Sequence, residues 1–409
     1  MTPLVPLETA RSEILAAVTV LAPIDVAVRD AHGLVLAADV VTQEDVPPFA
    51  NTAMDGYALR AADTAGAAPG APVPLEVVGD LPAGKAPDVA VGAGQAIRIM
   101  TGAPMPPGAD AIVMVERTAR VGDRGVAIER EAQPGDHVRS VGGDLHAGQV
   151  VFTAGTLVRG AHVGVLSSVG VPTVRVYPRP RVGVLSTGDE LVDGGPLAPG
   201  QIRDSNRPML LALVREAGFE AVDLGLVRDD EDRITALLDD ALTQCDGVLT
   251  SGGVSVGDYD YVKAALDRLG HLDWRQVAIK PAKPLAFGVV RDTPVFGLPG
   301  NPVSSLVSFE LFARPALLQR AGHPFRFRPE VVARAEHAFA RKPDGKLHLD
   351  RVRVTRTDDS WRAGRTGDQA SNVLSVTAAA NGLALLPDGD GVAAGEELRV
   401  MLLDAEPDH

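Results

Sequence analysis

Short apolar runs alternate with longer amphipathic segments between residues 181 and 322. The apolar runs include RVGVLST, EAVDLGLV, GVLTS and PVFG, and the segments between them include NRPMLLALVREAG and ITALLDDALTQ. Short apolar runs suit buried strands, whereas apolar residues at every third or fourth position suit helices with one buried face. Their repeated alternation predicts a doubly wound α/β domain, in which helices cover both faces of a parallel sheet.

The rest of the chain has a different pattern. Ala10, Ile14 and Val18 are spaced as on one face of a helix, so a helix is expected between residues 7 and 21. Residues 46–145 contain short alternating runs separated by turns such as APGAP, which predicts a β-rich region, and GAHVGVLSSVG predicts a further helix. After residue 329 short alternating strands return, for which a small β-barrel is the natural expectation.

Three glycine-rich turns follow strands of the predicted α/β domain: STGDE (186–190), SGGVSVGD (251–258) and LPGNPVS (298–304). The carboxyl ends of strands in an open parallel sheet share one edge, where ligands bind. Backbone N–H groups in such turns suit a phosphate, although tight turns that need positive φ have the same composition. We expect a binding edge formed by Thr187, Gly188, Ser251, Gly252, Gly253, Ser255, Gly257, Pro299, Gly300, Asn301 and Pro302.

Acidic side chains accompany these strand ends. Glu190 follows the first strand, Asp229 the second and Asp260 the third. Clustered carboxylates can hold Mg²⁺ or accept hydrogen bonds from a heterocycle. Capping of the helices that follow is the favoured interpretation of Asp230 and Asp258. Glu190, Asp229 and Asp260 have less obvious capping roles, so they are the favoured functional acids.

The segment IKPAKP places Lys280 and Lys283 among prolines after a predicted strand. Proline restricts the backbone, so the two ammonium groups would be held near the edge of the sheet as an anion site. A solvated basic turn is an equally good interpretation of the same residues. Arg351 could add a bidentate donor from the last domain.

Composition limits the classes of function. The chain has 409 residues, 45% of them apolar, and a net charge of −14 from 39 basic and 53 acidic residues. Several domains are expected, and the acidic balance argues against nonspecific binding to nucleic acid or to an anionic membrane. The single cysteine, Cys245, excludes an intramolecular disulfide. Neither a signal peptide nor a membrane-spanning run is recognisable, so a cytoplasmic protein is expected.

Two segments of the β-rich region, NTAMDGYA (51–58) and RIMTGAPMPPGADAIV (98–113), have unusual compositions. Asp55-Gly56 is a common hairpin turn, and that is the default interpretation. Asn51, Thr52 and Tyr57 nevertheless supply more polar chemistry than a turn requires. Thr101 similarly interrupts a strand before a proline-rich stretch.

Taken together, these segments resemble the molybdopterin molybdenumtransferase (MoeA) family, which is related to the E domain of gephyrin. The matching stretches occur in the family's order between about residues 45 and 310. They are NTAMDGYA, RIMTGAPMPPGADAIV, GGDLHAGQVV, VLSTGDEL, GQIRDSN, SGGVSVGDYDYVK, AIKPAKP and GLPGNPVS. The number and order of these motifs exclude a chance agreement.

The resemblance implies four domains. These are a discontinuous helical and linker domain one (1–45 and 146–176), a β-rich domain two (46–145), a domain three similar to the MogA-type molybdopterin adenylyltransferase (177–325) and a barrel domain four (326–409). It also implies an elongated homodimer, in which the crevice of domain three faces domain two of the partner chain. That arrangement explains why the segments around Asp55 and Thr101 are chemically rich although they lie far from the α/β domain in sequence.

The implied reaction inserts molybdate into adenylylated molybdopterin in the presence of Mg²⁺, and it releases AMP and the molybdenum cofactor. By motif match, the family's active-site positions are Asp55, Thr101, Asp144, Glu190, Asp229 and Asp260. The basic positions expected to receive molybdate are Lys280, Lys283 and Arg351, joined by Ser371. Asp229 and Asp260 are the expected ligands of Mg²⁺, and a MogA-type adenylyltransferase and molybdoenzyme maturation proteins are the expected partners.

Two other functions are compatible with such a chain. One is a gephyrin-like scaffold, and the other is adenylyl transfer of the MogA type, which would not need the segments around Asp55 and Thr101. Tungstate in place of molybdate is a further variant, because the two oxyanions are nearly isosteric.

Overall fold

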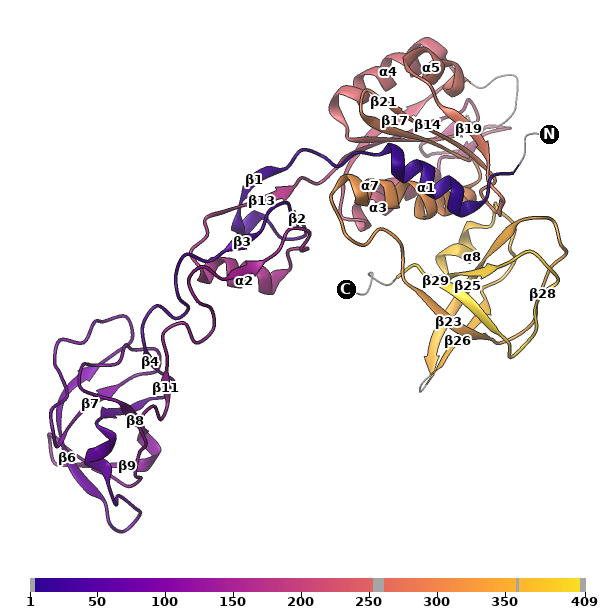
Figure 1. Ribbon diagram of the computed structural model, residues 1–409. Helices are drawn as coiled ribbons and strands as arrows, with labels where there is room; N and C mark the ends of the chain where they lie inside the picture. The colour runs from indigo at the N-terminus through magenta and orange to yellow at the C-terminus, as the bar shows by residue number, and fades with distance from the viewer. Residues whose placement is uncertain (1–3, 253–260, 358–359, 405–409) are drawn as a thin grey trace.

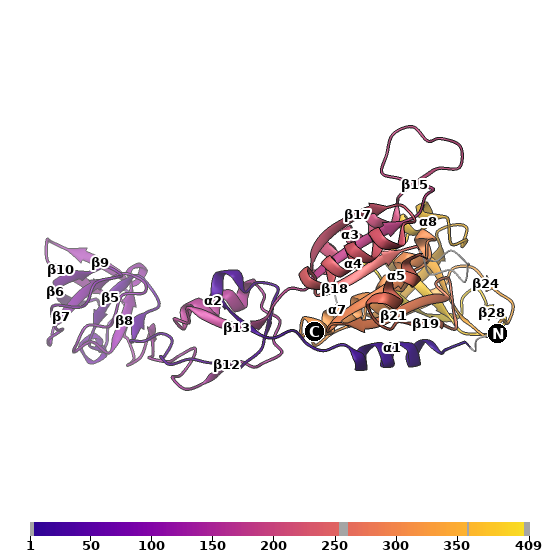
Figure 2. The ribbon, with the colours of Figure 1, turned by 90° about the horizontal axis from the view of Figure 1, so that it is seen from above.

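The computed structural model describes residues 4–252, 261–357 and 360–404. Figure 1 shows an elongated molecule, in which a distal lobe is joined through a narrow arm to a larger body. The view from above in Figure 2 has the same order of parts. Among the described residues, no helix combines the length and the apolar character needed to cross a membrane.

Four names are used below for the parts of the molecule. They are the distal lobe (51–139), the arm (24–41 and 150–177), the α/β unit (181–320) and the barrel (330–402). The α/β unit and the barrel together make up the body.

The distal lobe is built on a six-stranded sheet with the order β8-β5-β7-β6-β10-β9. Leu59, Val113 and Ile128 are among the buried residues of its core. The strands are β5 (Gly56–Leu59), β6 (Val73–Leu81), β7 (Gln95–Ile99), β8 (Ala111–Met114), β9 (Thr118–Val121) and β10 (Gly125–Ile128). A separate pair, β4 (Asn51–Thr52) and β11 (Val138–Arg139), and the 3₁₀ turns η2 (Ala61–Thr64) and η3 (Val115–Arg117) complete the lobe.

The default expectation that Asp55-Gly56 forms a hairpin turn is wrong. β4 pairs with β11, whereas β5, which begins at Gly56, pairs with β7 and β8. Gly56 passes so close to β8 that an added methyl group would lie 2.2 Å from the carbonyl oxygen of Val113. Glycine is therefore required there for the close approach of two backbones.

The arm contains a three-stranded antiparallel sheet, a short strand pair and one helix. Leu36, Val158, Leu166 and Val176 are buried in its core. The elements are β1 (Ile24–Ala27), η1 (Val28–Asp30), β2 (Val35–Leu36), β3 (Val40–Val41), β12 (Val150–Phe152), α2 (Gly160–Ser168) and β13 (Thr173–Tyr177). The helix expected in GAHVGVLSSVG is confirmed as α2.

The expected N-terminal helix is α1 (Leu7–Ala17), and its buried face includes Ala10 and Ile14. This face joins the core of the α/β unit. The side chain of Gln319 in α7 (Arg314–Arg320) donates hydrogen bonds of 2.6 Å to the carbonyl oxygens of Leu15 and Val18. The chain therefore starts on the body and then runs out along the arm.

The α/β unit has a six-stranded sheet with the order β17-β14-β18-β22-β21-β19. The first four are parallel: β14 (Arg181–Thr187), β17 (Glu220–Val227), β18 (Gly247–Ser251) and β22 (Thr293–Leu298). The prediction of a wholly parallel sheet is wrong at one edge, where β19 (Asp273–Gln276) and β21 (Pro284–Val290) are antiparallel to their neighbours. Arg291 and Asp292 have φ of 51° and 69° and form the two-residue turn from β21 to β22. Such turns join antiparallel strands.

Helices cover both faces of this sheet, as predicted, because two separate clusters of buried residues lie between the sheet and the helices. One face carries α1, α3 (Asn206–Glu216), α6 (Pro302–Ser308), the π-helical turn η4 (Phe309–Ala313) and α7. The other carries α4 (Glu231–Gln244) and α5 (Tyr261–Leu269). Asp230 accepts a 3.0 Å bond from the backbone of Arg233, which confirms its capping interpretation. A projecting loop, visible in Figure 2, carries β15 (Leu191–Val192) and β16 (Ile202–Arg203).

The expected C-terminal barrel is confirmed, because the pairing of β25 with β27 closes a ring of five strands. The ring consists of β23 (Glu330–Ala335), β25 (Leu347–Thr357), β26 (Ser360–Arg365), β27 (Gly382–Leu386) and β29 (Glu397–Leu402). β24 (Phe339–Ala340), α8 (Leu374–Ala378) and β28 (Gly391–Val392) are attached to it. A short strand of the α/β unit, β20 (Ile279–Lys280), pairs in parallel with β25 and places Lys280 opposite His348.

Candidate functional site

The strand register brings the three glycine-rich turns together. Ser186 pairs with Ser251, and Ser251 pairs with Leu298, so the strands end side by side. The backbone N–H of Gly252 donates a 3.2 Å bond to the carbonyl of Leu298. An added methyl group on Gly252 would lie 3.0 Å from the carbonyl oxygen of Thr187. Polar turn atoms therefore crowd this edge of the sheet, which we call the crevice.

Two residues at the start of α3 and just before it contact all three turns. The Nδ2 group of Asn206 donates two 2.7 Å hydrogen bonds, one to Ser251 Oγ and one to the carbonyl of Gly300. Ser186 Oγ donates a 3.2 Å bond to the buried carboxylate of Asp204. Sequence reasoning missed Asn206 and Asp204 as site residues. The available signal was their place in GQIRDSN, directly before a helix, but nothing in that segment identifies their distant partners.

Arg207 holds Asp204 and the start of α3 in place. Its Nε donates a 3.1 Å bond to Asp204, and its Nη1 contacts both carboxylate oxygens of Asp223 at 2.6 Å. A further contact joins Arg207 Nη2 to Asp193, on the projecting loop. The arginine is buried, with 8% of its surface exposed, so one guanidinium group connects α3, β17 and the loop that begins at Glu190.

Replacing Arg207 with methionine is expected to lower the free energy of unfolding by about 3–5 kcal/mol, because it leaves a buried carboxylate without its cation. That carboxylate belongs to Asp204, whose side chain is 1% exposed. Urea unfolding at neutral pH measures the change. Arg215→Met, at an exposed position on the same helix, is the control and should change stability by less than about 0.5 kcal/mol. Equal losses in both variants would contradict the anchoring role.

Carboxylates lie close together at the next strand end. The backbone N–H of Asp229 donates a long, 3.4 Å bond to Asp189 Oδ1. Partial burial, followed by the charges of Asp189 and Glu190, raises the pKa of Asp229 above its ordinary value. The structure thus places two of the predicted acids, Glu190 and Asp229, in one electrostatic group.

Four predicted site residues lie outside the described residues: Gly253, Ser255, Gly257 and Asp260. The capping interpretation of Asp258 lies outside them as well. Within the described ranges, no group of three or more histidine, cysteine, aspartate or glutamate side chains is arranged to hold a metal ion.

The predicted basic residues line one cleft between the α/β unit and the barrel, with a volume of about 1020 Å³. Lys280, Lys283 and Pro299 come from the α/β unit, and Arg351 and Ser371 come from the barrel side. Two further predicted residues lie next to this cleft. Asn301 lines it, and its side chain does not cap α6; Pro302 is the first residue of that helix.

The two lysines are exposed in the cleft, and neither forms an ion pair with a carboxylate of any described residue. Their loop is held by a 2.7 Å bond from the backbone of Val277 to the carbonyl of Lys283. Ala282 between them is buried and has φ of 71°, a conformation that costs an L-residue roughly 1 kcal/mol. The backbone is therefore fixed while the ammonium groups remain available to an anion.

Arg351 is fully buried beneath the cleft. Its Nη2 donates bonds to the carbonyls of Asp368 at 3.2 Å and Ala370 at 3.0 Å, which shapes the loop before Ser371. The backbone N–H of Val303 donates a 3.2 Å bond to the carbonyl of Ser371, so this loop contacts α6. Burial lowers the pKa of Arg351 below its ordinary value.

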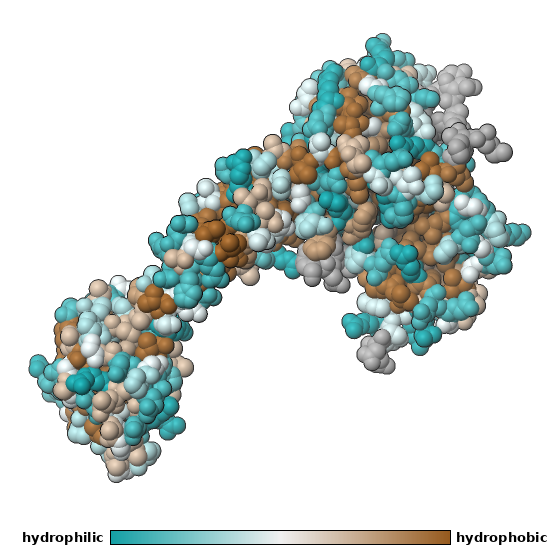
Figure 3. Space-filling model, in the orientation of Figure 1, coloured by the Kyte–Doolittle hydropathy of each residue, from teal (hydrophilic) through white to brown (hydrophobic). Residues whose placement is uncertain are grey.

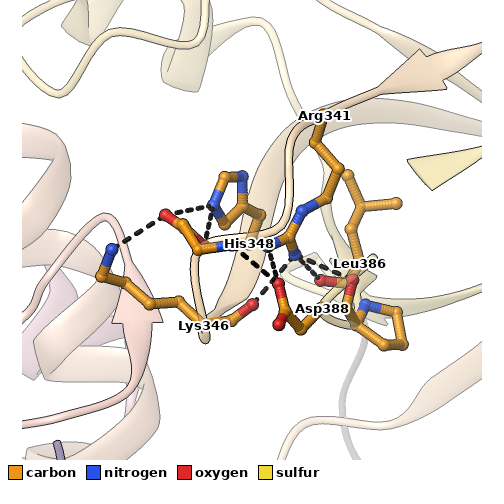
Figure 4. A network of polar contacts seen from close by, with 7 residues as sticks. Arg341, Lys346, His348, Leu386 and Asp388 are labelled. Carbon is orange, nitrogen blue, oxygen red and sulfur yellow. Dashed lines mark hydrogen bonds and ion pairs between the residues drawn. The ribbon is translucent and has the colours of Figure 1, made fainter. Parts of the chain in front are cut away.

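A separate network holds the barrel side of the cleft (Figure 4). Arg341 donates 2.8 Å bonds to the carbonyl of Leu386 and to Asp388. Asp344 lies 2.8 Å from Lys346 Nζ and 3.2 Å from His348 Nε2. The hydrogen bond from Lys346, followed by that from His348, holds the pKa of Asp344 far below its usual range. Lys346 is therefore neutralised by a neighbour, in contrast to Lys280 and Lys283.

Three predicted residues lie away from the body. The carboxylate of Asp55 accepts two 2.7 Å bonds from Thr101, one from its backbone and one from its hydroxyl. The hydroxyl bond, followed by the backbone bond, lowers the pKa of Asp55. Asp144 is exposed where the arm meets the distal lobe, and its backbone donates a 2.9 Å bond to Val46.

Within one chain these three residues do not meet the crevice. Asp55 lies between β4 and β5 of the distal lobe, and both views place that lobe at the opposite end of the molecule from the sheet of the α/β unit (Figures 1 and 2). The structure therefore joins Asp55 to Thr101 on the lobe, leaves Asp144 between the lobe and the arm, and gathers the other described site residues on the body.

Comparison with known families covers nearly the whole chain. Residues 5–170 match the MoeA N-terminal region (domain I and II), residues 183–319 match a probable molybdopterin binding domain, and residues 333–403 match the MoeA C-terminal region (domain IV).

Individual relatives agree with these matches. A protein from Mycobacterium tuberculosis named molybdopterin molybdenumtransferase 2 is 44% identical over 392 residues, which cover 92% of this chain and 94% of the relative. A molybdopterin molybdenumtransferase from Nostoc is 39% identical and covers 91% of this chain and 87% of the relative. The crystal structure of a molybdopterin biosynthesis MoeA protein from Pyrococcus horikosii superposes with a TM-score of 0.81 at 33% identity, over 99% of this chain and 100% of that one.

Proposed function

This chain belongs to the MoeA family of molybdopterin molybdenumtransferases, and we propose that it inserts molybdate into adenylylated molybdopterin with release of AMP. The family assignment makes it a transferase of molybdenum cofactor biosynthesis. The observation that carries the specific proposal is the cleft beside the crevice, where Lys280 and Lys283 have no carboxylate partner among the described residues.

The cleft suits a small oxyanion. Molybdate is a dianion, and ammonium groups without an internal counter-charge form strong hydrogen bonds to such ions. Lys280 and Lys283 would bind it from one wall. The hydroxyl of Ser371 lies in the cleft lining, and Arg351 supports the loop before it. The chain as a whole has a net charge of −14, which repels an anion. A local excess of cations therefore directs molybdate to this cleft rather than to the rest of the surface.

The crevice suits the pterin nucleotide. Backbone N–H groups of glycine-rich turns at strand ends bind phosphates. Thr187 and Ser251 lie at the same edge, where Ser251 Oγ accepts a bond from Asn206. Asn206 holds two of the turns at a fixed separation. Since Pro299 and Asn301 belong to the third turn and also line the cleft, a substrate bound along the turns would reach the molybdate site.

Asp229 is suited to hold Mg²⁺ together with Asp260. The raised pKa of Asp229 reflects partial burial and negative neighbours, so a cation would be favoured there. Mg²⁺ commonly binds through one or two carboxylates together with substrate phosphates. When bound, it would stabilise the charge that develops as the phosphoanhydride is cleaved.

Asp55, Thr101 and Asp144 would complete the site in a homodimer, from the partner subunit. One chain keeps them remote from its own crevice (Figure 1). The arm also exposes apolar side chains: Val41 and Val150 are register partners and are 36% and 47% exposed. Figure 3 shows hydrophobic groups over the narrow part of the arm, and such a surface suits contact with a second copy.

The cellular context follows from the reaction. A MogA-type adenylyltransferase would supply the adenylylated substrate, molybdoenzyme maturation proteins would receive the product, and both steps belong in the cytoplasm. The proposal includes no nucleic acid or membrane partner.

The proposed reaction is tested by incubating the purified protein with adenylylated molybdopterin, molybdate and Mg²⁺. AMP should appear together with the ability to activate a molybdoenzyme that lacks its cofactor. Consumption of ATP with unmodified molybdopterin, without insertion of molybdate, would instead indicate an adenylyltransferase.

Asp229→Asn is expected to stabilise the metal-free protein at neutral pH and to abolish stabilisation by Mg²⁺. Folding raises the pKa of Asp229, so the stability that its protonated form contributes is complete below the ordinary pKa of about 3.9 and is lost as pH rises through the folded value. The free energy of unfolding of the asparagine variant should therefore rise relative to that of the parent as pH rises from 4 to 7. Adding Mg²⁺ at 100 times its dissociation constant should stabilise the parent by about 2.7 kcal/mol.

Denaturant unfolding across this pH range, with and without Mg²⁺, measures both effects. Asp240→Asn, at an exposed position on α4, is the matched control and should respond to Mg²⁺ as the parent does. A parent protein indifferent to Mg²⁺ would overturn the metal assignment.

A further inference from the structure

A second cavity, of about 210 Å³, lies where the arm meets the α/β unit. Its walls come from the arm (33–35 and 157), from the connecting segment 177–180, and from the ends of α3 and α7 with the residues after them. Figure 1 shows the arm entering the body beside α3 and α7. None of its lining residues belongs to the crevice or to the cleft of Lys280 and Lys283.

A buried arginine that shares its one close carboxylate with a second arginine lies in this wall. Arg314 is 6% exposed; its Nη1 donates a long, 3.4 Å bond to the carbonyl of Arg326, and its Nε has no hydrogen-bond partner. The nearest carboxylate is Glu310, whose Oε2 is 3.9 Å from that Nε, beyond hydrogen-bond distance. Glu310 instead accepts bonds of 2.9 and 3.1 Å from Arg328. Burial, followed by the charge of Arg328, lowers the pKa of Arg314 to about 10.

The rest of the lining indicates the kind of ligand. Arg179 adds a positive charge, whereas Glu216, an exposed side chain, is the one acid in the lining. Leu34, Leu157 and Phe219 supply apolar walls. The volume corresponds to about seven water molecules. One carboxylate, Glu310, faces two arginines here, which leaves an excess of buried positive charge. Such an excess is costly, and a small anion with an apolar body would satisfy both the charge and the walls.

We propose that this cavity binds a small organic carboxylate, whose carboxylate group pairs with Arg314 and whose apolar part packs on the leucines. Because its walls belong to both arm and body, the ligand binds the arm orientation that forms the cavity and favours that orientation over others. The site therefore couples a metabolite to the position of the distal lobe.

Isothermal titration calorimetry with benzoate tests this site in the full-length Lys280→Met/Lys283→Met protein, in which the cleft has lost its free lysines. Benzoate should bind saturably at one site, and acetate and inorganic phosphate should bind at least tenfold more weakly. Arg314→Leu in the same background should weaken benzoate at least tenfold. Arg29→Leu, a highly exposed arginine of the arm, is the control and should leave binding unchanged.

A second variant guards against simple misfolding of Arg314→Leu. Ala321→Leu adds bulk to the cavity wall and keeps Arg314, and it should abolish benzoate binding without lowering the melting temperature. Absence of saturable binding in the parent, equal binding after Arg314→Leu, or retained binding after Ala321→Leu would each overturn the proposal. Molybdate is not the probe, so these outcomes are separate from those of the molybdate site.

Discussion

Mixed dimers of Asp55→Asn and Asp229→Asn subunits are expected to recover about one quarter of the parent activity, because random pairing gives one half hybrids and each hybrid has one intact site of two. Each variant alone should lose at least about 100-fold, the usual contribution of an active-site acid. The physical basis is the separation of the two residues. Asp55 belongs to the distal lobe with Thr101, and Asp229 belongs to the sheet edge with Asp189 and Glu190.

The experiment requires coexpression of the two variants with different affinity tags. The unfractionated mixture should show about one quarter of the parent activity, and the hybrid isolated by tandem purification should show about one half, since each hybrid keeps one intact site of two. Glu190→Gln combined with Asp229→Asn is the matched control. Both changes lie in the same crevice, so every hybrid site would carry one defect and activity should remain low. Purified Asp55/Asp229 hybrids without recovered AMP release would contradict a site shared between subunits.

Lys280→Met/Lys283→Met is expected to raise the dissociation constant of molybdate by about 100-fold or more, since two charge-assisted hydrogen bonds of roughly 1.5 kcal/mol each are lost and 1.4 kcal/mol is tenfold. Both ammonium groups lack a carboxylate partner among the described residues, so an anion loses their full interaction. Calorimetric titration with molybdate measures the loss. The dependence of binding on ionic strength should also weaken, because fewer charges face the ion.

Lys85→Met, an exposed lysine of the distal lobe, is the control for this pair and should leave molybdate binding unchanged. Lys346→Met is a stricter comparison, because this residue also lines the cleft but is paired with Asp344 at 2.8 Å. Its effect should be smaller than that of the double variant. An unchanged dissociation constant in the double variant would exclude the two lysines as the molybdate site.

Local sequence predicted the elements that depend on local physics. Apolar spacing in residues 7–21 and 206–216 matched α1 and α3, and Asp230 was correctly recognised as a possible helix cap. The wholly parallel sheet was wrong because a two-residue turn at Arg291 reverses the chain. The hairpin at Asp55 was wrong because β4 pairs with β11 while β5 pairs with β7 and β8, where Gly56 allows a close approach to Val113. In both places a short motif allows two geometries, and pairing with a distant strand selects one.

The site shows the same division. Strand-end glycines, acids and the lysine–proline segment were recognisable from composition, because neighbouring residues determine whether a turn forms and which groups it carries. The roles of Asn206 and Arg207 were not recognisable, since their partners lie up to 94 positions away. Arg351 could be named as a donor, but its full burial and its support of the loop at Ala370 follow from the barrel around it.

The amino-acid sequence by itself determined the alternation of strands and helices, the family, and the acids, hydroxyls and lysines available for chemistry, because each is encoded in short segments. Only the tertiary structure decided which of them meet. Pairing of β20 with β25 brings the lysine loop against the barrel, and the extended arm carries Asp55 away from its own crevice (Figure 1). Both outcomes depend on packing between residues far apart in the chain. Such contacts are determined by the exclusion of solvent and by strand register, which a local sequence pattern does not specify.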